Sequence, residues 1–218
     1  MASVEVQTLQ VADLGSFKAP EEVQVREIQD DFLINGRYLI QSPYTEQPHL
    51  ADLETLDNEN ALLARALTKF RVLREDYATS PYVDSFNWPE VISELKRLTD
   101  ETGRGFRETS FYIVAFRSQI KTNTVYADLG RLDKAAHAEA VASGGFLKYW
   151  FGEPDSELRN LATCIWRSRE DAKNGGRGPA HREAAGATRA MYAFWKIDQH
   201  RLIIRDGVDS WDIIPWQE

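Results

Sequence analysis

The chain has 218 residues and a formal net charge of −8, and it is long enough to bury a large core without disulfide or metal staples. Its single cysteine excludes a disulfide within the chain, and no stretch has the apolar length of a membrane span. Because the N-terminus MASVEVQTLQ also lacks the basic flank and apolar run of a secretory signal, we expect a soluble cytoplasmic protein with no membrane partner.

The charge is distributed unevenly along the chain. Residues 1–105 contain 10 Lys and Arg against 19 Asp and Glu, whereas residues 106–218 contain 16 against 15. The acidic half would repel a phosphate backbone, and the nearly neutral half has no basic stripe. We therefore expect no nucleic acid partner. The change in charge also predicts a domain boundary near residues 103–105.

The N-terminal half predicts a hairpin and two helices. Apolar alternation over Val4–Val11 favours an edge strand, and Asn35-Gly36 between two apolar runs is typical of a type I′ hairpin turn. Helical spacing of apolar residues predicts a helix over Asn58–Arg74, with the stripe Leu63, Leu67, Phe70 and Leu73. An aromatic-rich loop follows. A second helix is expected between a cap at Asn87 and a stop at Gly103.

The C-terminal half alternates strands and helices. We predict strands at 110–117, 146–152, 159–167 and 201–205, and a helix at 128–143. Ser168, with Asp171 three residues later, begins a further helix as an approximate capping box. That helix is interrupted at residues 175–179 and resumes on a face that includes Tyr192 and Trp195. The final residues, GVDSWDIIPWQE, form either an edge strand or a packed tail.

This order of elements predicts an α+β fold with a ferredoxin-like split βαβ sheet and two helices on one face. Residues 106–218 would form this ferredoxin-like α+β barrel domain. Residues 1–105 would form an acidic N-terminal extension, with a hairpin and two helices, packed on the core. The second sheet face is apolar and must be buried. A second copy of the chain, in a homodimer, and the N-terminal extension are both candidates for covering it.

Several segments resemble an uncharacterised family of fungal proteins. They are REDYATSPYVDSFNW, FYIVAFRSQI, GGFLKYWFGEPD, RNLATCIWRSREDA and GPAHREA. The resemblance covers most of residues 70–205 and implies a dimeric α+β barrel-like fold in an intracellular fungal protein. It supplies no catalytic residue. The broader barrel superfamily, which includes cofactor-free monooxygenases and decarboxylases, is an analogy of fold alone.

Three side chains are candidate catalytic groups. Asp133 precedes His137 by four residues, so on a helix its carboxylate can hold one imidazole nitrogen and leave the other free for acid–base work. His181 falls in the first turn of a helix, where the helix dipole favours the neutral ring. The structural alternatives are a histidine tethered by its neighbour and a histidine that closes a helix start.

Cations and aromatic residues on the predicted sheet are candidate substrate-binding groups. A buried cation without a partner is costly, and a bound carboxylate would relieve that cost. Pairing with Asp or Glu at the sheet ends is the alternative. Aromatic residues would give a cavity flat apolar walls that suit an aromatic molecule. The candidates are Arg117, Lys148, Tyr149, Trp150, Trp166 and Arg167.

Other chemistry has little support in the sequence. The glycine-rich turn at 175–178 matches neither the Walker pattern nor the dinucleotide fingerprint. Cys164 has no cation close to it in sequence and is expected to be a buried thiol rather than a nucleophile. No Cys-x-x-Cys or His-Glu-x-x-His spacing occurs, so we predict neither a metal nor a cofactor.

Two hypotheses of function remain open. In the first, the chain is a small-molecule-binding protein that acts on an apolar or aromatic acid by acid–base chemistry, such as decarboxylation, cyclisation or cofactor-free oxygenation. In the second, it is a non-enzymatic intracellular interaction protein. The sequence does not decide whether the chain is an enzyme. An RNA-binding module is disfavoured because FYIVAFRSQI lacks the pattern of an RNA-reading strand.

Overall fold

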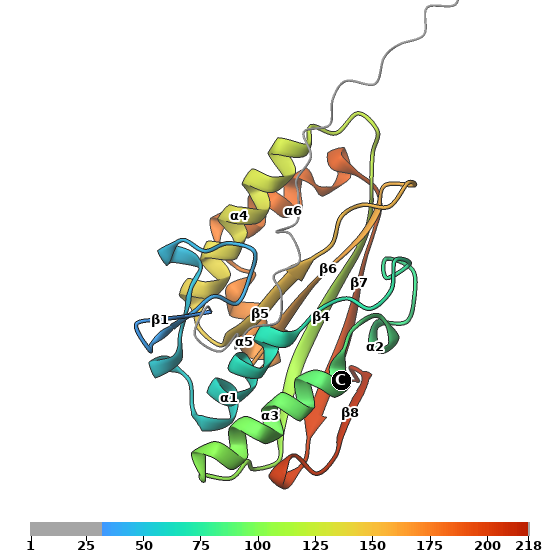
Figure 1. The fold of residues 1–218 in the computed structure, drawn as a ribbon. Helices are drawn as coiled ribbons and strands as arrows, with labels where there is room; N and C mark the ends of the chain where they lie inside the picture. Colours follow the sequence, from blue (N-terminus) through green and yellow to red (C-terminus); the bar gives the residue numbers. More distant parts are fainter. Residues whose placement is uncertain (1–31, 218) are drawn as a thin grey trace, which may run out of the picture.

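A computed structural model describes residues 32–217 of the chain (Figure 1). The expected strand at Val4–Val11 lies outside the described residues. The strands are β1 (Leu33–Ile34), β2 (Tyr38–Leu39), β3 (Ala51–Asp52), β4 (Thr109–Ile120), β5 (Phe146–Phe151), β6 (Arg159–Trp166), β7 (Tyr192–Ile204) and β8 (Trp211–Pro215). The helices are α1 (Asn58–Ala66), α2 (Tyr82–Ser85), α3 (Trp88–Thr102), α4 (Tyr126–Ser143), α5 (Arg169–Gly175) and α6 (Pro179–Met191).

The large sheet is antiparallel and has the strand order β5-β6-β4-β7-β8. Along the chain, β4 leads through α4 to β5, a turn leads to β6, and α5 and α6 lead to β7. The first of these four strands therefore lies between the third and the fourth, which is the ferredoxin-like arrangement. The predicted α+β fold is confirmed. β8 adds a fifth strand, so the C-terminal residues form an edge strand rather than a packed tail.

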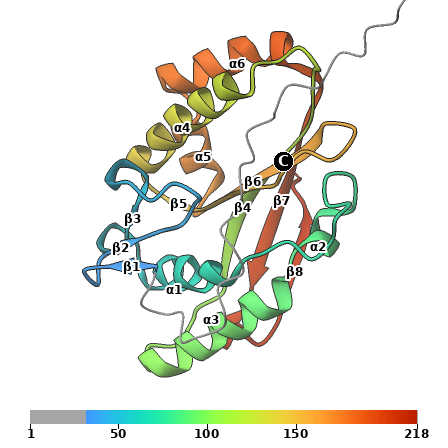
Figure 2. The same cartoon turned by 45° about the horizontal axis from the view of Figure 1, so that its top comes forward.

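Helices cover both faces of this sheet (Figure 2). α4, α5 and α6 lie on one face, and α1 and α3 lie on the other. On the second face, apolar residues of α1 and α3 share one buried core with β4, β5, β6 and β7. Leu63, Trp88 and Leu95 are completely buried there, together with Ile113 and Ile165 of the sheet. In the described chain, α1 and α3 of the N-terminal extension thus occupy the face for which a second copy was the other candidate.

Local sequence signals fix several element ends. Asn35 and Gly36 both have positive φ, and Arg37 N–H donates to Ile34 O, as a type I′ turn requires. The Ser168 hydroxyl accepts from the Asp171 backbone N–H and caps α5. Gly103 adopts the left-handed conformation that ends α3. Each of these predictions is confirmed.

The predicted helix over Asn58–Arg74 was wrong in its length. α1 ends at Ala66, and a short 3-10 turn carries the chain to Lys69. Phe70 then becomes extended and stacks on Phe86 with ring centroids 4.5 Å apart. The core contact therefore takes precedence over the helical spacing. Leu73, placed on the predicted apolar stripe, is 52% exposed.

The helix that resumes after residue 179 is also shorter than predicted. α6 ends at Met191, and Tyr192 and Trp195 belong to β7. The run YAFWKI is rich in aromatic and β-branched residues, which favour strands. It pairs with β4 from Ile120 to Phe116, and this tertiary pairing overrides the helical spacing. As a result, β7 is far longer than the predicted strand at 201–205.

Candidate functional site

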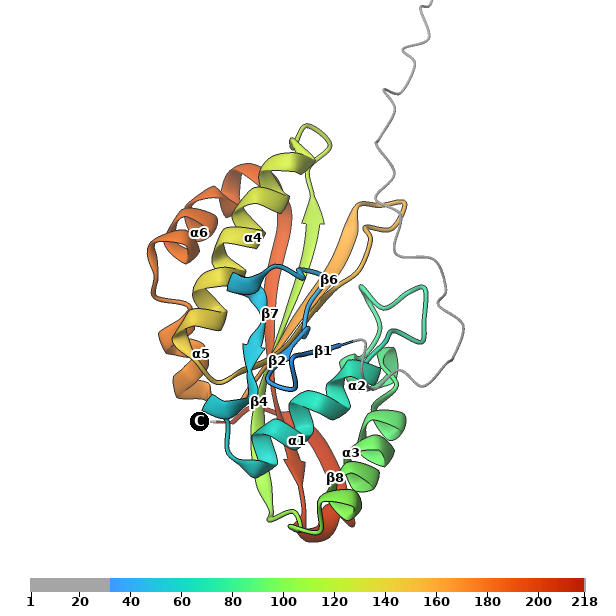
Figure 3. The same ribbon diagram turned by 60° about the vertical axis from the view of Figure 1, so that its left-hand side comes forward.

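Five polar side chains from three parts of the fold meet beside β5. Tyr44 and His49 come from residues 41–50, which we name the covering segment. Asp133 and His137 lie four residues apart on α4, and Tyr149 is on β5. The covering segment lies against α4 (Figure 3), and it reaches β5 through the Tyr149 N–H, which donates to Gln41 O at 3.0 Å. We name these five residues the tyrosine–histidine cluster.

The Asp133 carboxylate is held by two phenol groups. The Tyr44 hydroxyl donates to Oδ2 at 2.5 Å, and the Tyr149 hydroxyl donates to Oδ1. Burial raises the pKa of Asp133, and the two hydrogen bonds oppose this rise by favouring the charged form. Burial and the nearby carboxylate raise the pKa of both tyrosines, so each remains a donor at neutral pH.

The two histidines of the cluster contact each other directly. Nδ1 of His49 lies 2.9 Å from Nδ1 of His137, and each of the two residues is 4% exposed. Burial lowers the pKa of His49 and lowers that of His137 to about 3. Both rings are therefore neutral near pH 7, so one Nδ1 donates and the other accepts.

The second nitrogen of His137 is left without a partner. Its Nε2 atom is buried and forms no hydrogen bond with residues 32–217. In one tautomer this atom is an unused acceptor, and in the other it is an unused donor. The rings of Phe146, Tyr149 and Tyr44 surround His137, with centroids 5.1 to 5.3 Å away. The imidazole that carries the unpaired nitrogen thus lies among aromatic rings.

The expected hydrogen bond between Asp133 and His137 is absent from the described contacts. Both Asp133 oxygens instead bind tyrosines, and His137 binds His49. His181 lies at the start of α6, where its Nδ1 is 3.0 Å from Glu139 Oε2. The same Glu139 accepts the backbone N–H groups of Ala180 and His181. The structure therefore places His181 at a helix start and not in the tyrosine–histidine cluster.

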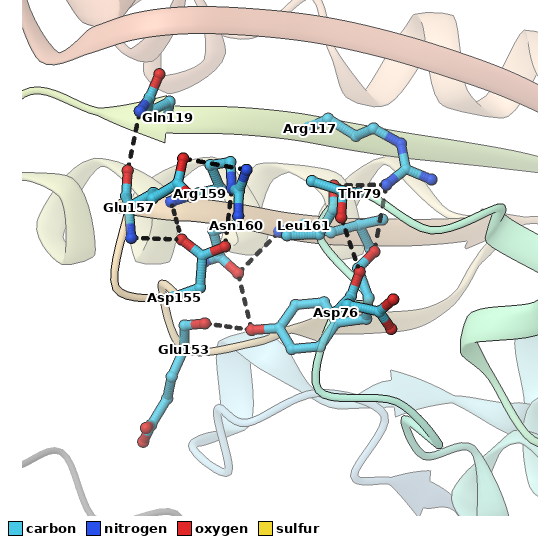
Figure 4. A network of polar contacts seen from close by, with 12 residues as sticks. Asp76, Thr79, Arg117, Gln119, Glu153, Asp155, Glu157, Arg159, Asn160 and Leu161 are labelled. Atoms are coloured by element: carbon cyan, nitrogen blue, oxygen red, sulfur yellow. Dashed lines mark hydrogen bonds and ion pairs between the residues drawn. The ribbon is translucent and has the colours of Figure 1, made fainter.

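Two of the three candidate cations are paired. Arg117 donates to Asp198 at 2.9 Å and to the backbone oxygens of residues 77, 78 and 80, and it thereby anchors that loop to the sheet (Figure 4). Arg167 forms two hydrogen bonds with Asp171, at 2.6 and 2.9 Å. Both arginines have the structural partners that the sequence left as the alternative.

Lys148 lies on the sheet face opposite to His137. It pairs with Ile165 of the α1 face, whereas the neighbouring Tyr149 pairs with Cys164. The residue is 8% exposed, and its ammonium has no hydrogen-bond or ion-pair partner among residues 32–217. Burial lowers the pKa of Lys148 to about 8. Gln41, which bonds to Tyr149 through its backbone, is also buried with its amide group unpartnered among these residues.

The aromatic candidates divide between the two faces. Tyr149 belongs to the cluster. Trp166 packs on Phe146 beneath α4, with ring centroids 4.5 Å apart. Trp150 lies on the α1 face, edge to face with Tyr77 and Phe86. The substrate-binding set expected from the sequence is therefore not gathered in one place.

No pattern in the sequence singles out Tyr44 or His49 as a site residue. These residues lie 89 and 88 positions from their partners Asp133 and His137. The covering segment is irregular apart from the 3-10 turn Gln47–His49, so it has no periodicity that would reveal which side chains point inward. Only its position on α4 brings these two rings to the site.

The described residues give little support to metal binding or membrane insertion. Within residues 32–217, no group of three or more His, Cys, Asp or Glu side chains is placed to hold a metal ion. Burial raises the pKa of the Cys164 thiol, as expected for a core thiol. Among the helices of the described chain, none combines the length and the apolar character needed to cross a bilayer.

Comparisons with known proteins agree on a family. A family model described as PB2B2.08-like matches residues 40–215. UPF0643 protein PB2B2.08 from Schizosaccharomyces pombe is 37% identical over 183 residues, which are 80% of this chain and 83% of the relative. The resemblance to a fungal family is thereby confirmed.

Solved structures with some similarity are shorter and distant in sequence. SnoaB, a cofactor-independent oxygenase from Streptomyces nogalater, is 14% identical, with 42% of this chain and 90% of that chain covered and a TM-score of 0.35. A conserved protein from Methanosarcina mazei Go1 is also 14% identical, with the same coverage and a TM-score of 0.37. On the sequence match over most of its length, the chain belongs to the PB2B2.08-like family.

Proposed function

We propose that this chain binds an apolar or aromatic small molecule at the tyrosine–histidine cluster and uses His137 as its acid–base group. The observation that supports this most is the buried Nε2 of His137, which has no hydrogen-bond partner in the described chain. Leaving a buried polar atom unpaired costs about 1–3 kcal/mol. A ligand that pairs with this atom would recover that cost.

The aromatic rings around His137 indicate which class of ligand would fit there. Phe146, Tyr149 and Tyr44 present ring faces or edges to His137. Among residues 32–217, Lys134 is the cation that contacts the cluster: its Nζ lies 5.6 Å from the centre of the Tyr44 ring and binds Glu46 of the covering segment. A neutral aromatic molecule with a hydroxyl group or an acidic C–H suits this environment better than an ion, because the apolar walls would penalise its charge.

The histidine pair can accept a proton from such a ligand. In the tautomer with a proton on Nδ1 of His137, Nε2 carries the free electron pair. When Nε2 takes the ligand's proton, the Nδ1 proton can pass across 2.9 Å to His49. His137 then stays neutral, and the positive charge moves to His49. The Tyr44 ring contacts both imidazoles, and its hydroxyl remains fixed on Asp133.

Access to His137 requires the covering segment to move. His49 and His137 are almost fully buried, and the segment is held by side-chain bonds from Tyr44, His49 and Glu46 to α4. The Glu46 to Lys134 pair is half exposed and therefore weak. Opening that breaks these few contacts would expose the cluster while the sheet core remains intact.

The test combines native mass spectrometry with NMR of ¹⁵N-histidine-labelled protein. The chain purified from a fungal host should carry an added mass on the order of a few hundred daltons, the size of a ligand that such pockets hold. The variant His137→Phe should lose it. Titration with 2-naphthol should shift the Nε2 resonance of His137, whereas naphthalene, which lacks the hydroxyl, should shift it much less.

His181→Gln is the matched control, because this histidine lies outside the cluster and should leave both readouts unchanged. A bound molecule that His137→Phe retains would overturn the assignment of the site. The assignment would also be overturned if the purified chain carried no added mass and 2-naphthol did not shift the His137 Nε2 resonance.

A further inference from the structure

A β-bulge in β5 directs Lys148 to the sheet face that carries α1. Phe146 pairs with Trp166, and Lys148 pairs with the neighbouring Ile165, so β5 advances two residues while β6 advances one. Regular alternation would have placed Lys148 on the same face as Phe146, beneath α4. β5 is an edge strand of the large sheet. Bulges are common at sheet edges and beside active sites, where they redirect a side chain in this way.

The bulge leaves the Lys148 amine in an apolar environment with no charge to balance it. Within residues 32–217, the ammonium has neither a hydrogen-bond nor an ion-pair partner, and the residue is 8% exposed. Burial lowers the pKa of Lys148 to about 8, and no charged group of the described chain contributes to this shift. At pH 7 the unprotonated amine is therefore about 250-fold more abundant than in an ordinary lysine.

The amine is nevertheless within reach of a small molecule. The amide of Gln41, whose backbone oxygen binds Tyr149 beside Lys148, is completely enclosed. The Lys148 Nζ is not completely enclosed, so its stem lies in the core while its tip remains accessible. An unprotonated, partly desolvated amine that a small molecule can reach is a nucleophile.

Aromatic rings adjoin the amine on the same face. Trp150 lies two residues after Lys148 in β5 and packs edge to face with Tyr77 and Phe86, with ring centroids 5.3 and 5.0 Å away. Because no charged group of the described chain lies close enough to shift the pKa of the lysine, a charged ligand would gain little there. These surroundings favour an uncharged aromatic molecule.

We infer that Lys148 forms an imine with an aromatic aldehyde. The electron pair of the neutral amine attacks the carbonyl carbon, and a C=N bond replaces the C=O bond. The two amine protons leave with the carbonyl oxygen as water, so the step needs neither an oxidant nor a reductant. An imine is a weaker base than an amine, and its formation removes the ammonium whose burial is unfavourable. A bulge and an unpaired lysine, both unfavourable to the fold, are typical of a functional position.

Reductive trapping on the full chain tests this inference. The protein is incubated at pH 7 with benzaldehyde and sodium cyanoborohydride, which reduces an imine to a stable amine, and peptide mapping locates each benzyl group. Lys148 should be labelled at least about tenfold faster than an ordinary lysine such as Lys173, which is exposed on α5. The α-amino group of the chain has an ordinary pKa near 8 and serves as the internal reference.

Three controls separate the site from general amine chemistry. Lys148→Met should abolish the fast labelling and remain folded, whereas Lys173→Met should retain the fast labelling. Urea should abolish it in the parent chain, because unfolding returns the amine to water. Propanal lacks the aromatic ring, so its labelling of Lys148, relative to that of the α-amino group, should be weaker than that of benzaldehyde.

Labelling of Lys148 at the rate of Lys173 would overturn the inference, and so would fast labelling that persists in urea. An equal preference for propanal and benzaldehyde would overturn the aromatic class of the aldehyde. His137 lies on the opposite sheet face, so His137→Phe should leave the labelling of Lys148 unchanged. Failure at Lys148 is therefore distinct from failure of the function proposed for the tyrosine–histidine cluster.

Discussion

His49 and His137 share a hydrogen bond of 2.9 Å between their Nδ1 atoms, although 88 positions separate them in the chain. Among residues 32–217, no carboxylate binds a nitrogen of either ring, so burial dominates and disfavours the charged forms. The bond satisfies one nitrogen of each ring and leaves Nε2 of His137 unpaired among the described residues. This relationship underlies both the proposed function and the expected response of the protein to acid.

Stability should fall as the pH decreases below 6.5. The unfolded chain protonates these histidines near the ordinary pKa of 6.5, whereas His137 in the folded chain has a pKa of about 3. The unfolded state thus binds more protons between these values, and acid favours it. His137 alone should cost roughly 1–2 kcal/mol between pH 6.5 and 5. Urea unfolding across this range measures the effect.

The double variant His49→Phe with His137→Phe is the comparison for this prediction. It removes both titrating rings while keeping aromatic side chains in the core. Its free energy of unfolding should change less with pH than that of the parent chain. An equally steep dependence in both proteins would show that the histidine pair is not its cause.

Removing one phenol donor should raise the pKa of Asp133. The hydrogen bond from Tyr44 favours the carboxylate, so Tyr44→Phe should shift the titration of Asp133 to higher pH. Loss of this charge-assisted bond should also destabilise the fold by about 1–3 kcal/mol. NMR titration of the ¹³C carboxyl resonance and urea unfolding provide the two measurements. Tyr126 is half exposed and lies on α4, the helix that carries Asp133. Tyr126→Phe should leave the pKa of Asp133 and the free energy of unfolding nearly unchanged.

Replacement of Lys148 by an apolar side chain should stabilise the protein. Lys148 is 8% exposed and its ammonium has no hydrogen-bond or ion-pair partner in the described chain, so Lys148→Met should raise the free energy of unfolding at pH 7 by on the order of 1–3 kcal/mol. In the parent chain the folded-state pKa is about 8 and the ordinary value is 10.5. The unfolded state therefore binds more protons across this window, and parent stability should rise with pH there. This rise should vanish in Lys148→Met, while Lys134→Met, at an exposed lysine, should retain it. A loss of stability in Lys148→Met would contradict the expectation.

Replacing each of two helical glycines by alanine should change the free energy of unfolding in opposite directions. A Cβ at Gly175 would overlap the ring of Trp166, whereas a Cβ at Gly186 would meet no atom within 4 Å. Gly175→Ala should lower the free energy of unfolding by roughly 1–3 kcal/mol through overpacking. Gly186→Ala should raise it by about 0.5–1 kcal/mol because alanine is the better helix former. Thermal and urea unfolding of the pair provide the comparison, and equal changes would refute the predicted packing at Trp166.

The sequence predictions that agree best with the structure are those that depend only on neighbouring residues. Asn35-Gly36, the Ser168 cap and the stop at Gly103 depend on local backbone conformation, and each is found where it is expected. The order of strands and helices from β4 onward also follows from local apolar patterns. Because few arrangements satisfy that order, it led to the ferredoxin-like sheet.

Predictions failed where a distant contact outweighs a local preference. Tyr192 and Trp195 continue a helical pattern in the sequence, but pairing with β4 makes them part of a strand. Asp133 and His137 have the spacing of a hydrogen-bonded helical pair, but Tyr44, Tyr149 and His49 bind them instead. In both cases the decisive partner lies far away in the chain.

By itself, the sequence determined the fold class, the element order and the position of His137 and Asp133 on one helix, because these depend on periodicity and local conformation. Only the tertiary structure decided that α1 and α3 cover one sheet face, that Lys148 lies opposite to His137, and that the covering segment completes the cluster. These outcomes depend on which apolar surfaces bury one another. A single sequence shows which residues must be buried, but it does not show against what.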